Sequence, residues 1–466
     1  ASLLEVGGGT LTGDFTVRRY VNKTNSWNFI ATPVLGQTWA SWHDNFPVTN
    51  LTPAPFSNGL GNLSAFSYDG TIPTSSYEPP PSSITNGWIA PSSANLTVGA
   101  GYRVWIRKSL ENTPHFGAFD NKGAINIGTT TRAVSFNAAG WDGGGWNFMG
   151  NPYPATLDWN LVHAGNSFLN NSVYIWNSTN LSYEFYTAPS GPGGSRRYIA
   201  SGQAFMVKTT AANNMTFTES MKTSAFNNTF VRQAVELTQP YFGIKVTNHD
   251  GYYDETFIWD NKNATLEYDP QYDAQKLPST FISLYTTTPS GKILASNAFD
   301  IQELSIIPLY FHAEQVGSHR FTFSNVGAMG QAEIFLRDNL MNTLTKISDG
   351  AEYVFDVQQS GYFTNERFEI IYSPEQLVSN GITINQHLMI YPNPVESDNV
   401  QIRISGVKEG NYQISILDVM GRMVVNDKLS LSGNFTYKPV DKLTPGVYWV
   451  HLAGSSIKSV QKLIVR

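Results

Sequence analysis

Apolar and polar residues alternate along most of this chain, which is the pattern of a half-buried β-strand. Residues 102–107 (Tyr-Arg-Val-Trp-Ile-Arg) and 412–416 (Tyr-Gln-Ile-Ser-Ile) are clear examples. Turn-forming pairs such as Asp69-Gly70 separate such runs. The helical period is almost absent, and only residues 374–378 have the composition of a single helical turn. The pattern therefore predicts an all-β protein of tandem antiparallel β-sandwiches, jelly-roll and immunoglobulin-like in type.

The front half contains an internal repeat of two sequence marks. Residues 26–33 (Ser-Trp-Asn-Phe-Ile-Ala-Thr-Pro) match residues 145–152 (Gly-Trp-Asn-Phe-Met-Gly-Asn-Pro). Further along, residues 101–108 are echoed by residues 202–208, so both marks recur in the same order. Because only two copies occur, the repeat indicates a duplicated β-module and not a solenoid. We expect the two copies to pack together as one unit.

Length, repeat and local charge together predict four domains. A chain of 466 residues is too long for one ordinary core, and domains of about 150 residues would give three or four. The repeat assigns residues 1–130 to a first β-module and residues 131–235 to a second. An acidic stretch predicts a third β-sandwich at residues 236–380, and the slightly basic residues 386–466 form a C-terminal domain.

Composition excludes several classes of protein. Charged residues make up 14% of the chain and the net charge is −6, so nothing in the charge indicates nucleic acid or an anionic membrane as a partner. The chain has no cysteine, which excludes disulfides, zinc–thiolate sites and thiol nucleophiles. No stretch approaches the roughly 18 apolar residues of a spanning helix. The chain opens without Met or a signal peptide, so we expect a mature product or a fragment.

The C-terminal region carries four marks in order. They are a strand closed by two prolines that cannot donate to a ladder, an alternating strand that enters a Gly-Arg turn, a Pro-Gly turn that starts another strand, and a basic terminal strand. These marks occupy residues 388–394, 412–422, 443–448 and 460–466. Each is ordinary β-structure alone, and any immunoglobulin-like domain would show alternation and Pro-Gly turns.

Together, the four marks resemble the type A sorting domain of type IX secretion cargo. The resemblance implies a secreted or cell-surface protein of a Gram-negative bacterium, which crosses the outer membrane already folded. The implied partners are the type IX translocon, an outer-membrane shuttle barrel and a surface sortase. By the motif match, the residues that the secretion machinery recognises are expected to be Pro392, Asn393, Pro394, Gly421, Arg422, Gly446, Tyr448, Lys462 and Arg466. An equal alternative is that these residues determine the fold of the domain.

The body of the chain has a second resemblance. Residues 145–154 with residues 202–205 resemble modules common in large type IX cargo proteins of adhesin-like character. Residues 254–277 resemble the domain that often precedes the sorting tail. These families imply no chemistry that can be transferred. They favour a surface scaffold or adhesin-like cargo, and we expect the chain not to be an enzyme.

A search for catalytic motifs supports that expectation. The 8 histidines are scattered, and neither a HExxH zinc motif, a GxSxG nucleophile elbow nor a phosphate-binding loop occurs. The sequence therefore predicts no catalytic residue and no cofactor. One metal interpretation stays open, because Asp250, Asp254 and Glu255 lie in an acidic cluster that offers hard oxygen ligands for a structural Ca²⁺. The alternative for that cluster is a solvated acidic face.

Tryptophan supplies the remaining candidate site. Most of the 11 tryptophans precede residue 180. One interpretation places Trp39, Trp42, Trp88 and Trp141 on loops, as a platform that stacks on sugar rings. The other places them in the packing of the repeated modules. The first interpretation predicts the alternative function, a carbohydrate-binding module that could belong to a larger polysaccharide-degrading protein, with a glycan as ligand.

Overall fold

A computed structural model confirms the all-β prediction. The chain divides into two compact units, Ala1–Tyr372 and Ser373–Arg466. The predicted helical turn at residues 374–378 lies outside the described residues. The structure describes residues 3, 11–21, 23–43, 45–46, 48, 63–72, 87–106, 118–140, 143–193, 196–225, 241–277, 279–301, 306–329, 333–341, 343–373, 388–390, 395, 397, 400–418, 421–439, 442–454 and 458–466.

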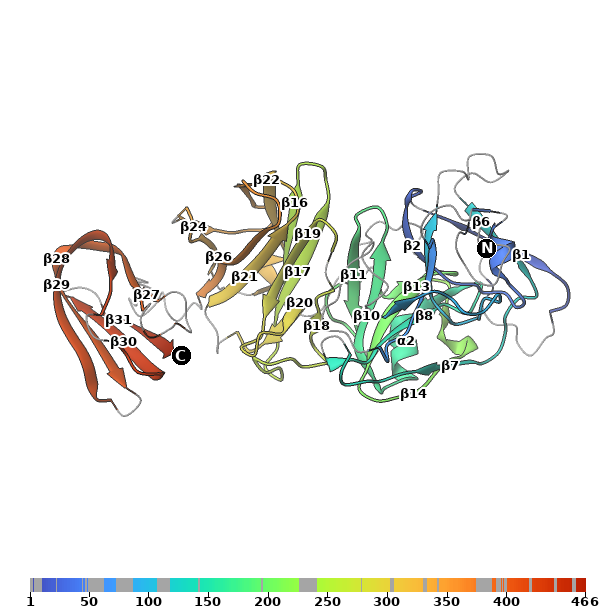
Figure 1. Ribbon diagram of the computed structural model, residues 1–466, viewed down its shortest axis with the longest axis horizontal. Helices are drawn as coiled ribbons and strands as arrows, with labels where there is room; N and C mark the ends of the chain where they lie inside the picture. Colours follow the sequence, from blue (N-terminus) through green and yellow to red (C-terminus); the bar gives the residue numbers. More distant parts are fainter. Residues whose placement is uncertain are drawn as a thin grey trace. The chain divides into compact units, whose positions relative to one another are not determined.

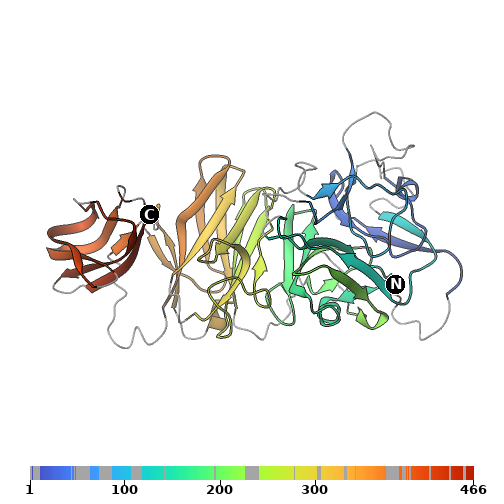
Figure 2. The ribbon, with the colours of Figure 1, turned by 60° about the horizontal axis from the view of Figure 1, so that its bottom comes forward.

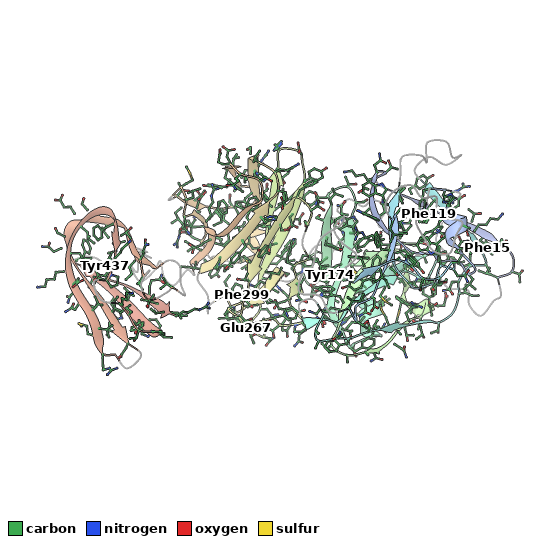
Figure 3. The ribbon with its side chains drawn as sticks, in the orientation of Figure 1. Phe15, Phe119, Tyr174, Glu267, Phe299 and Tyr437 are labelled. Carbon is green, nitrogen blue, oxygen red and sulfur yellow. The ribbon has the colours of Figure 1, made fainter. Side chains whose placement is uncertain are left out.

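The first copy of the repeat is built on a four-stranded sheet in the order β2-β5-β3-β4, with β1 and β6 paired beside it. The core of this copy contains Trp39, Trp42 and Phe119, the last of which is labelled in Figure 3. The elements are β1 (Phe15–Tyr20), β2 (Ser26–Ile30), α1 (Trp39–His43), β3 (Ala65–Tyr68), β4 (Trp88–Ile89), β5 (Tyr102–Ile106) and β6 (Ala118–Gly123).

The second copy has its own four-stranded sheet in the order β11-β10-β13-β8, a three-stranded sheet β12-β9-β15, and the pair β14-β7. The helix α2 begins where Asp158 accepts a hydrogen bond from the Asn160 backbone amide. The elements are β7 (Thr130–Val134), β8 (Trp146–Gly150), β9 (Thr156–Asp158), α2 (Trp159–Ala164), β10 (Leu169–Asn177), β11 (Ser182–Thr187), β12 (Tyr198–Ile199), β13 (Ala204–Thr209), β14 (Asn213–Phe217), the 3₁₀ turn η4 (Glu219–Met221) and β15 (Lys222–Thr223).

The two copies are related by a local pseudo-twofold arrangement. In each copy the two sequence marks are neighbouring antiparallel strands, β2 with β5 and β8 with β13. Beyond these ladders, Ile30 of the first copy bridges Gln203 of the second, and Met149 of the second bridges Ala100 of the first. Each copy therefore extends a strand of the other, which explains why the duplicated modules stay together.

The strand register corrects the alignment of the second mark. The sequence match aligns Gly101 with Gly202, an offset of 101 residues. The reciprocal bonds instead match Gly202 with Gly99, because the Ala31 amide donates to the Gly202 carbonyl and the Gly150 amide donates to the Gly99 carbonyl, both at 2.9 Å. Both glycines have a positive φ, as a turn at this point requires. The slip by an even number of residues keeps the same side chains on the same face.

The third module is one 11-stranded sheet in the order β24-β23-β26-β21-β19-β20-β17-β16-β22-β25, with β18 paired to β20. Its core contains Phe299, which is labelled in Figure 3. The elements are β16 (Tyr241–Asn248), β17 (Tyr253–Asp260), β18 (Ala274–Gln275), β19 (Ile282–Thr287), β20 (Ile293–Phe299), β21 (Ile306–Ala313), β22 (Gly317–Ser324), the 3₁₀ turn η5 (Val326–Met329), β23 (Glu333–Asp338), β24 (Thr343–Lys346), β25 (Glu352–Val357) and β26 (Tyr362–Ser373).

An aromatic cluster joins all three modules into the first unit. Trp27 and Phe29 of the first copy and Trp146 and Tyr174 of the second bury their rings together with small side chains of the third module, among them Ala274. In Figure 1 β18, which carries Ala274, lies next to β10 and β11. The three domains predicted for residues 1–130, 131–235 and 236–380 therefore share one compact unit, whose last residue is Tyr372.

The second unit is a five-stranded sheet in the order β27-β28-β30-β31, with β29 paired to β28. The long strands β28 and β29 curve around a separate hydrophobic core that includes Ile414, Val450 and Tyr437 (Figures 1, 2 and 3). The elements are β27 (Leu388–Ile390), β28 (Ile402–Asp418), β29 (Met423–Tyr437), β30 (Gly446–Gly454) and β31 (Lys458–Val465).

Candidate functional site

The Gly-Arg turn of the second unit closes the β28–β29 hairpin. Gly421 has a φ of 77°, which a residue with a Cβ adopts only with strain. The Asp418 amide donates to the Arg422 carbonyl at 2.9 Å, and the Arg422 Nε lies 2.7 Å from Asp418 Oδ2. Both predicted recognition residues therefore have a structural task in this turn, although the Arg422 guanidinium is still largely exposed.

The Pro-Gly turn is held by a tyrosine. Tyr448 is buried, and its hydroxyl donates to the Thr444 carbonyl oxygen at 2.7 Å. Gly446 is the first residue of β30. Tyr448 packs in the core between β28 and β31, so this predicted recognition residue is a fold determinant and does not present its ring to a partner.

The terminal strand β31 is closed at its end by a residue from the start of the unit. Val395 bridges Val465 in parallel, its amide donates to the Ile464 carbonyl, and the Arg466 amide donates to the Val395 carbonyl, both at 2.9 Å. Backbone pairing also places Lys462 opposite Trp449. Pro392, Asn393 and Pro394 lie outside the described residues, and they directly precede the residue that closes this edge.

An apolar row that the sequence did not single out lies on the outer side of the same sheet. Leu417 of β28 pairs directly with Met423 of β29 and with Trp449 of β30. Trp449 is 43% exposed and Met423 is 55% exposed, whereas the adjacent Tyr448 points into the core. Residues 447–452 predict a strand, but most of them are apolar on both faces of that strand. Such a segment does not reveal which face is buried.

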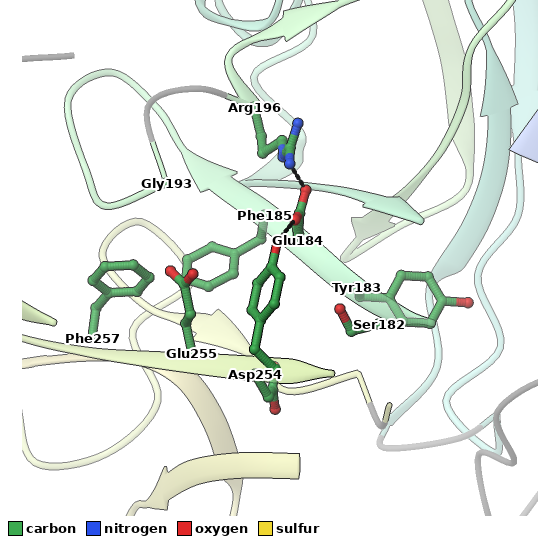
Figure 4. A pocket seen from close by; sticks show the side chains of 10 residues that line it. Ser182, Tyr183, Glu184, Phe185, Gly193, Arg196, Asp254, Glu255 and Phe257 are labelled. Atoms are coloured by element: carbon green, nitrogen blue, oxygen red, sulfur yellow. Dashed lines mark hydrogen bonds and ion pairs between the residues drawn. The ribbon is translucent and has the colours of Figure 1, made fainter. Parts of the chain in front are cut away.

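The body contains a small cleft at the junction of its second and third modules. It has a volume of about 50 Å³ and is lined by Ser182–Phe185, Gly193, Arg196, Tyr253–Glu255 and Phe257. Glu184 forms an ion pair with Arg196 and accepts a hydrogen bond from the Tyr253 hydroxyl at 2.9 Å (Figure 4). Because the Tyr253 hydroxyl of the third module binds the Glu184–Arg196 pair of the second, the cleft is a polar contact between the two modules. We call these three residues the clasp.

The predicted sugar platform is wrong for the three tryptophans that the structure describes. Trp39, Trp42 and Trp88 are all 1% exposed or less. Trp39 and Trp42 pack edge to face with each other and with Tyr102. Trp141 lies outside the described residues. Large aromatic rings contribute most to stability when they are buried, and these three pack in hydrophobic cores of the first unit.

The three carboxylates proposed for Ca²⁺ are not brought together. Asp254 and Glu255 are neighbours on β17 and therefore point to opposite faces. Asp254 is buried, pairs with the Lys276 ammonium and accepts from the Leu284 amide at 2.7 Å, while Asp250 lies 3.4 Å from His249 Nε2. Among the residues that the structure describes, no group of three His, Asp or Glu side chains could hold a metal ion.

A buried carboxyl group that the sequence did not single out lies beside this region. Asp273 is fully buried, and its two oxygens accept the Asp269 and Ala298 amides at 2.8 Å each. Burial, with a smaller contribution from the nearby Asp269 charge, raises the pKa of this carboxyl to about 8. Asp273 ties the loop before β18 to β20, so its role is structural.

Comparison with known proteins bears on both units. Residues 1–372 match a family described as a domain of unknown function (DUF8693), and residues 389–466 match the family described as the secretion system C-terminal sorting domain. No curated protein matches the chain. Among solved structures, a chain titled "Biofilm associated protein - BSP domain" aligns with 8% identity and a TM-score of 0.18, over 99% of this chain and 94% of that chain.

One further observation concerns membranes. Within the described part of the chain, none of the helices has the length and apolar character that crossing a bilayer takes. The described helices α1 and α2 are short and belong to the first unit.

Proposed function

We propose that this chain, which belongs through residues 1–372 to the family described as a domain of unknown function (DUF8693), is a non-enzymatic, adhesin-like scaffold. Its C-terminal sorting domain makes it type IX secretion cargo, which is exported across the outer membrane to the cell surface or the extracellular medium. The scaffold role concerns the body, Ala1–Tyr372, and the recognition role concerns the tail.

The observation that carries the scaffold proposal is the fusion of three β-modules into one body. The aromatic cluster is continued by polar bonds between modules: Lys208 Nζ donates to Gln275 Oε1 at 2.6 Å, and the Asn171 amide donates to the Pro270 carbonyl at 3.2 Å. Binding surfaces are commonly formed by loops that such a rigid scaffold positions. A body held together in this way is suited to presenting loops to an external surface.

The junction cleft has the features of a structural contact and not those of a substrate pocket. Its volume of about 50 Å³ is far below the roughly 300 Å³ of the smallest usual ligand pockets. Glu184, the carboxylate at its centre, already bonds with Arg196, Tyr253 and Asn177. Ion-pair networks of this kind stabilise a junction, and this one engages the Glu184 carboxylate.

The proposed partners of the tail are the translocon, the outer-membrane shuttle barrel and a surface sortase, and its separate fold supports this proposal. It folds as a unit of its own around a core that includes Ile402, Ile414 and Leu463. A folded cargo can therefore carry a folded label, and the label can be removed without opening the core of the body. Deletion of residues 388–466 should leave the protein in the periplasm, and normal export of the shortened chain would contradict this part of the proposal.

The adhesive role is tested with cells and with purified protein. A strain that lacks the gene should attach less to host-matrix proteins or to neighbouring cells, and display of the full chain should restore attachment. The purified chain should bind a surface ligand without cleaving it. Release of reducing sugar or of peptide fragments from the bound ligand would overturn the non-enzymatic assignment, and retention on a glycan array would identify the ligand as a carbohydrate.

A further inference from the structure

We propose that the secretion machinery docks on the outer face of the sorting domain, through a Trp449-centred apolar row bordered by basic residues. The inference rests on the proposed recognition of the tail and names the surface that is read. The outer face comprises the following register positions on the four paired strands: Gln413, Ser415 and Leu417 of β28; Met423, Asn426 and Lys428 of β29; Val447, Trp449, His451 and Ala453 of β30; and residues 458, 460, 462 and 464 of β31.

The apolar row is not needed by the core. Alternate residues of β30, among them Tyr448 and Val450, already fill the interior, and Trp449 lies on the opposite side of the strand. Leu417 connects Met423 and Trp449 into one row across three strands. An exposed row with a tryptophan at its centre is typical of a contact surface, because tryptophan is enriched among the residues that dominate binding energies.

The charge of this face indicates the partner's chemistry. Lys428 and His451 are exposed on it, and register positions 458 and 462 are also lysines. None of the positions that make up the outer face is Asp or Glu. Two carboxylates of the adjoining strands have partners within the domain, since Asp418 pairs with Arg422 and Asp427 accepts from the Tyr437 hydroxyl. An apolar patch with an acidic rim would complement such a face.

The closed end of β31 favours the face over the edge. Addition of a partner strand beside Ile464–Arg466 would have to displace Val395, which already pairs there. This end of the edge strand is therefore protected from pairing with other chains. The outer face is reachable without breaking any of these bonds.

The shape of the apolar row favours a protein over a lipid surface. A polar row runs beside it, in which Gln413 Nε2 donates to Asn426 Oδ1 at 2.6 Å and the Ser415 hydroxyl lies 3.3 Å from the same oxygen. A narrow apolar centre with a hydrogen-bonded polar rim is the anatomy of a protein interface. Insertion into a membrane instead requires a broad apolar face.

The test uses the full chain in a host with an active type IX system. Trp449→Ser and the charge reversal Lys428→Glu should each lower the ratio of exported to periplasmic protein about tenfold or more, as loss of a central contact residue does. The control is Val354→Ser, which changes an apolar residue of the body that is 61% exposed, against 43% for Trp449. Thermal unfolding of the purified variants verifies that they fold, and Lys428 is an exposed residue whose replacement leaves the core intact.

A photo-crosslinking amino acid at position 449 supplies the second measurement. It should form an adduct with a component of the secretion machinery, identified by mass spectrometry, and the same group at position 354 should not. Normal export of both face variants overturns the inference, as does a Trp449-dependent binding to phosphatidylglycerol vesicles with normal export. If deletion of residues 388–466 blocks export while the face variants are exported, only this inference fails. If the deleted chain is exported, the proposed recognition of the tail fails with it.

Discussion

The Tyr253 hydroxyl of the third module donates to Glu184 Oε1 of the second module at 2.9 Å. The same Glu184 oxygen accepts from Asn177 Nδ2 at 2.9 Å, and the carboxylate pairs with Arg196. The Glu184 carboxylate therefore bonds with Asn177 and Arg196 of its own module and with Tyr253 of the third module. This relationship makes the junction a specific contact and not a loose linker, and it predicts how the body responds to substitution.

Replacement of Tyr253 by phenylalanine should weaken the junction by about 1 kcal/mol, the typical net value of one hydrogen bond. The loss is modest because Arg196 and Asn177 still satisfy Glu184. Urea unfolding of the body measures the change. Tyr20→Phe is the matched control, because Tyr20 is largely exposed and should leave the unfolding midpoint unchanged. Equal midpoints for the two variants would show that the clasp contributes nothing.

The buried ion pair between Asp338 and Arg367 should be sensitive to substitution. Both side chains are buried, and Arg367 Nη2 lies 3.0 Å from Asp338 Oδ2. Asp338→Asn should cost about 3 to 5 kcal/mol of unfolding free energy, because it leaves the Arg367 guanidinium buried with a neutral neighbour.

The control for this prediction is an exposed pair in the same module. Arg320 Nη1 lies 2.8 Å from Glu352 Oε1, and both side chains are about half exposed. Glu352→Gln should therefore change the unfolding free energy by less than about 1 kcal/mol. Denaturant titration of both variants decides the matter, and similar losses for the two would contradict the assigned difference in burial.

The stability of the body should fall as pH rises between about 4 and 8. Asp273 has a folded-state pKa of about 8, raised by burial, whereas an unfolded aspartate titrates near 3.9. Between these values the folded state binds the proton more tightly, so the contribution of Asp273 to stability is largest below pH 4 and is lost as pH rises through the folded pKa. Burial raises the pKa of Asp254 as well, which acts in the same direction.

Unfolding midpoints measured from pH 4 to pH 9 provide the test. Asp273→Asn should flatten the slope in this window, whatever it does to absolute stability, because it removes the titrating group. Asp250→Asn, at an exposed site, should leave the slope as it is. A wild-type stability that rises steadily over this range would contradict the prediction.

The junction between the two repeat copies should not tolerate a side chain at residue 150. A Cβ at Gly150 would lie well inside van der Waals contact with the Ala100 carbonyl oxygen and the Ala31 Cβ. Gly150→Ala should therefore cost about 1 to 3 kcal/mol, as overpacking does. Gly327→Ala is the control, because its nearest new neighbour, Asp349 Oδ2, is 3.7 Å away. Calorimetry that finds the two variants equally stable would exclude the close junction.

The sorting domain was predictable because its signals are local. The prolines, the Gly421 turn and the alternation of Tyr412–Ile416 each depend on the conformation of a few consecutive residues. The order of these marks along the chain was therefore enough to identify the tail. The repeat of the front half was visible for the same reason, since a duplicated pair of strands leaves two copies of its sequence.

The role of individual aromatic residues could not be predicted in the same way. Trp39 follows the polar pair Gln37-Thr38, whereas Trp449 lies in an apolar run, yet the first is buried and the second is 43% exposed. Burial depends on which sheet face finds a partner, and that partner comes from residues far away in sequence. Likewise, Asp254 and Lys276 form a buried ion pair only because the fold of the third module brings β17 and the residue after β18 together.

The sequence alone established an all-β chain, a duplicated front, and a C-terminal export label, because period, repeat and turn chemistry are properties of short segments. Only the tertiary structure decided that the three front modules share one aromatic core, that Val395 closes the terminal strand, and which side of β30 carries the exposed tryptophan. These outcomes depend on long-range pairing, in which a shift of one residue turns every side chain to the other face.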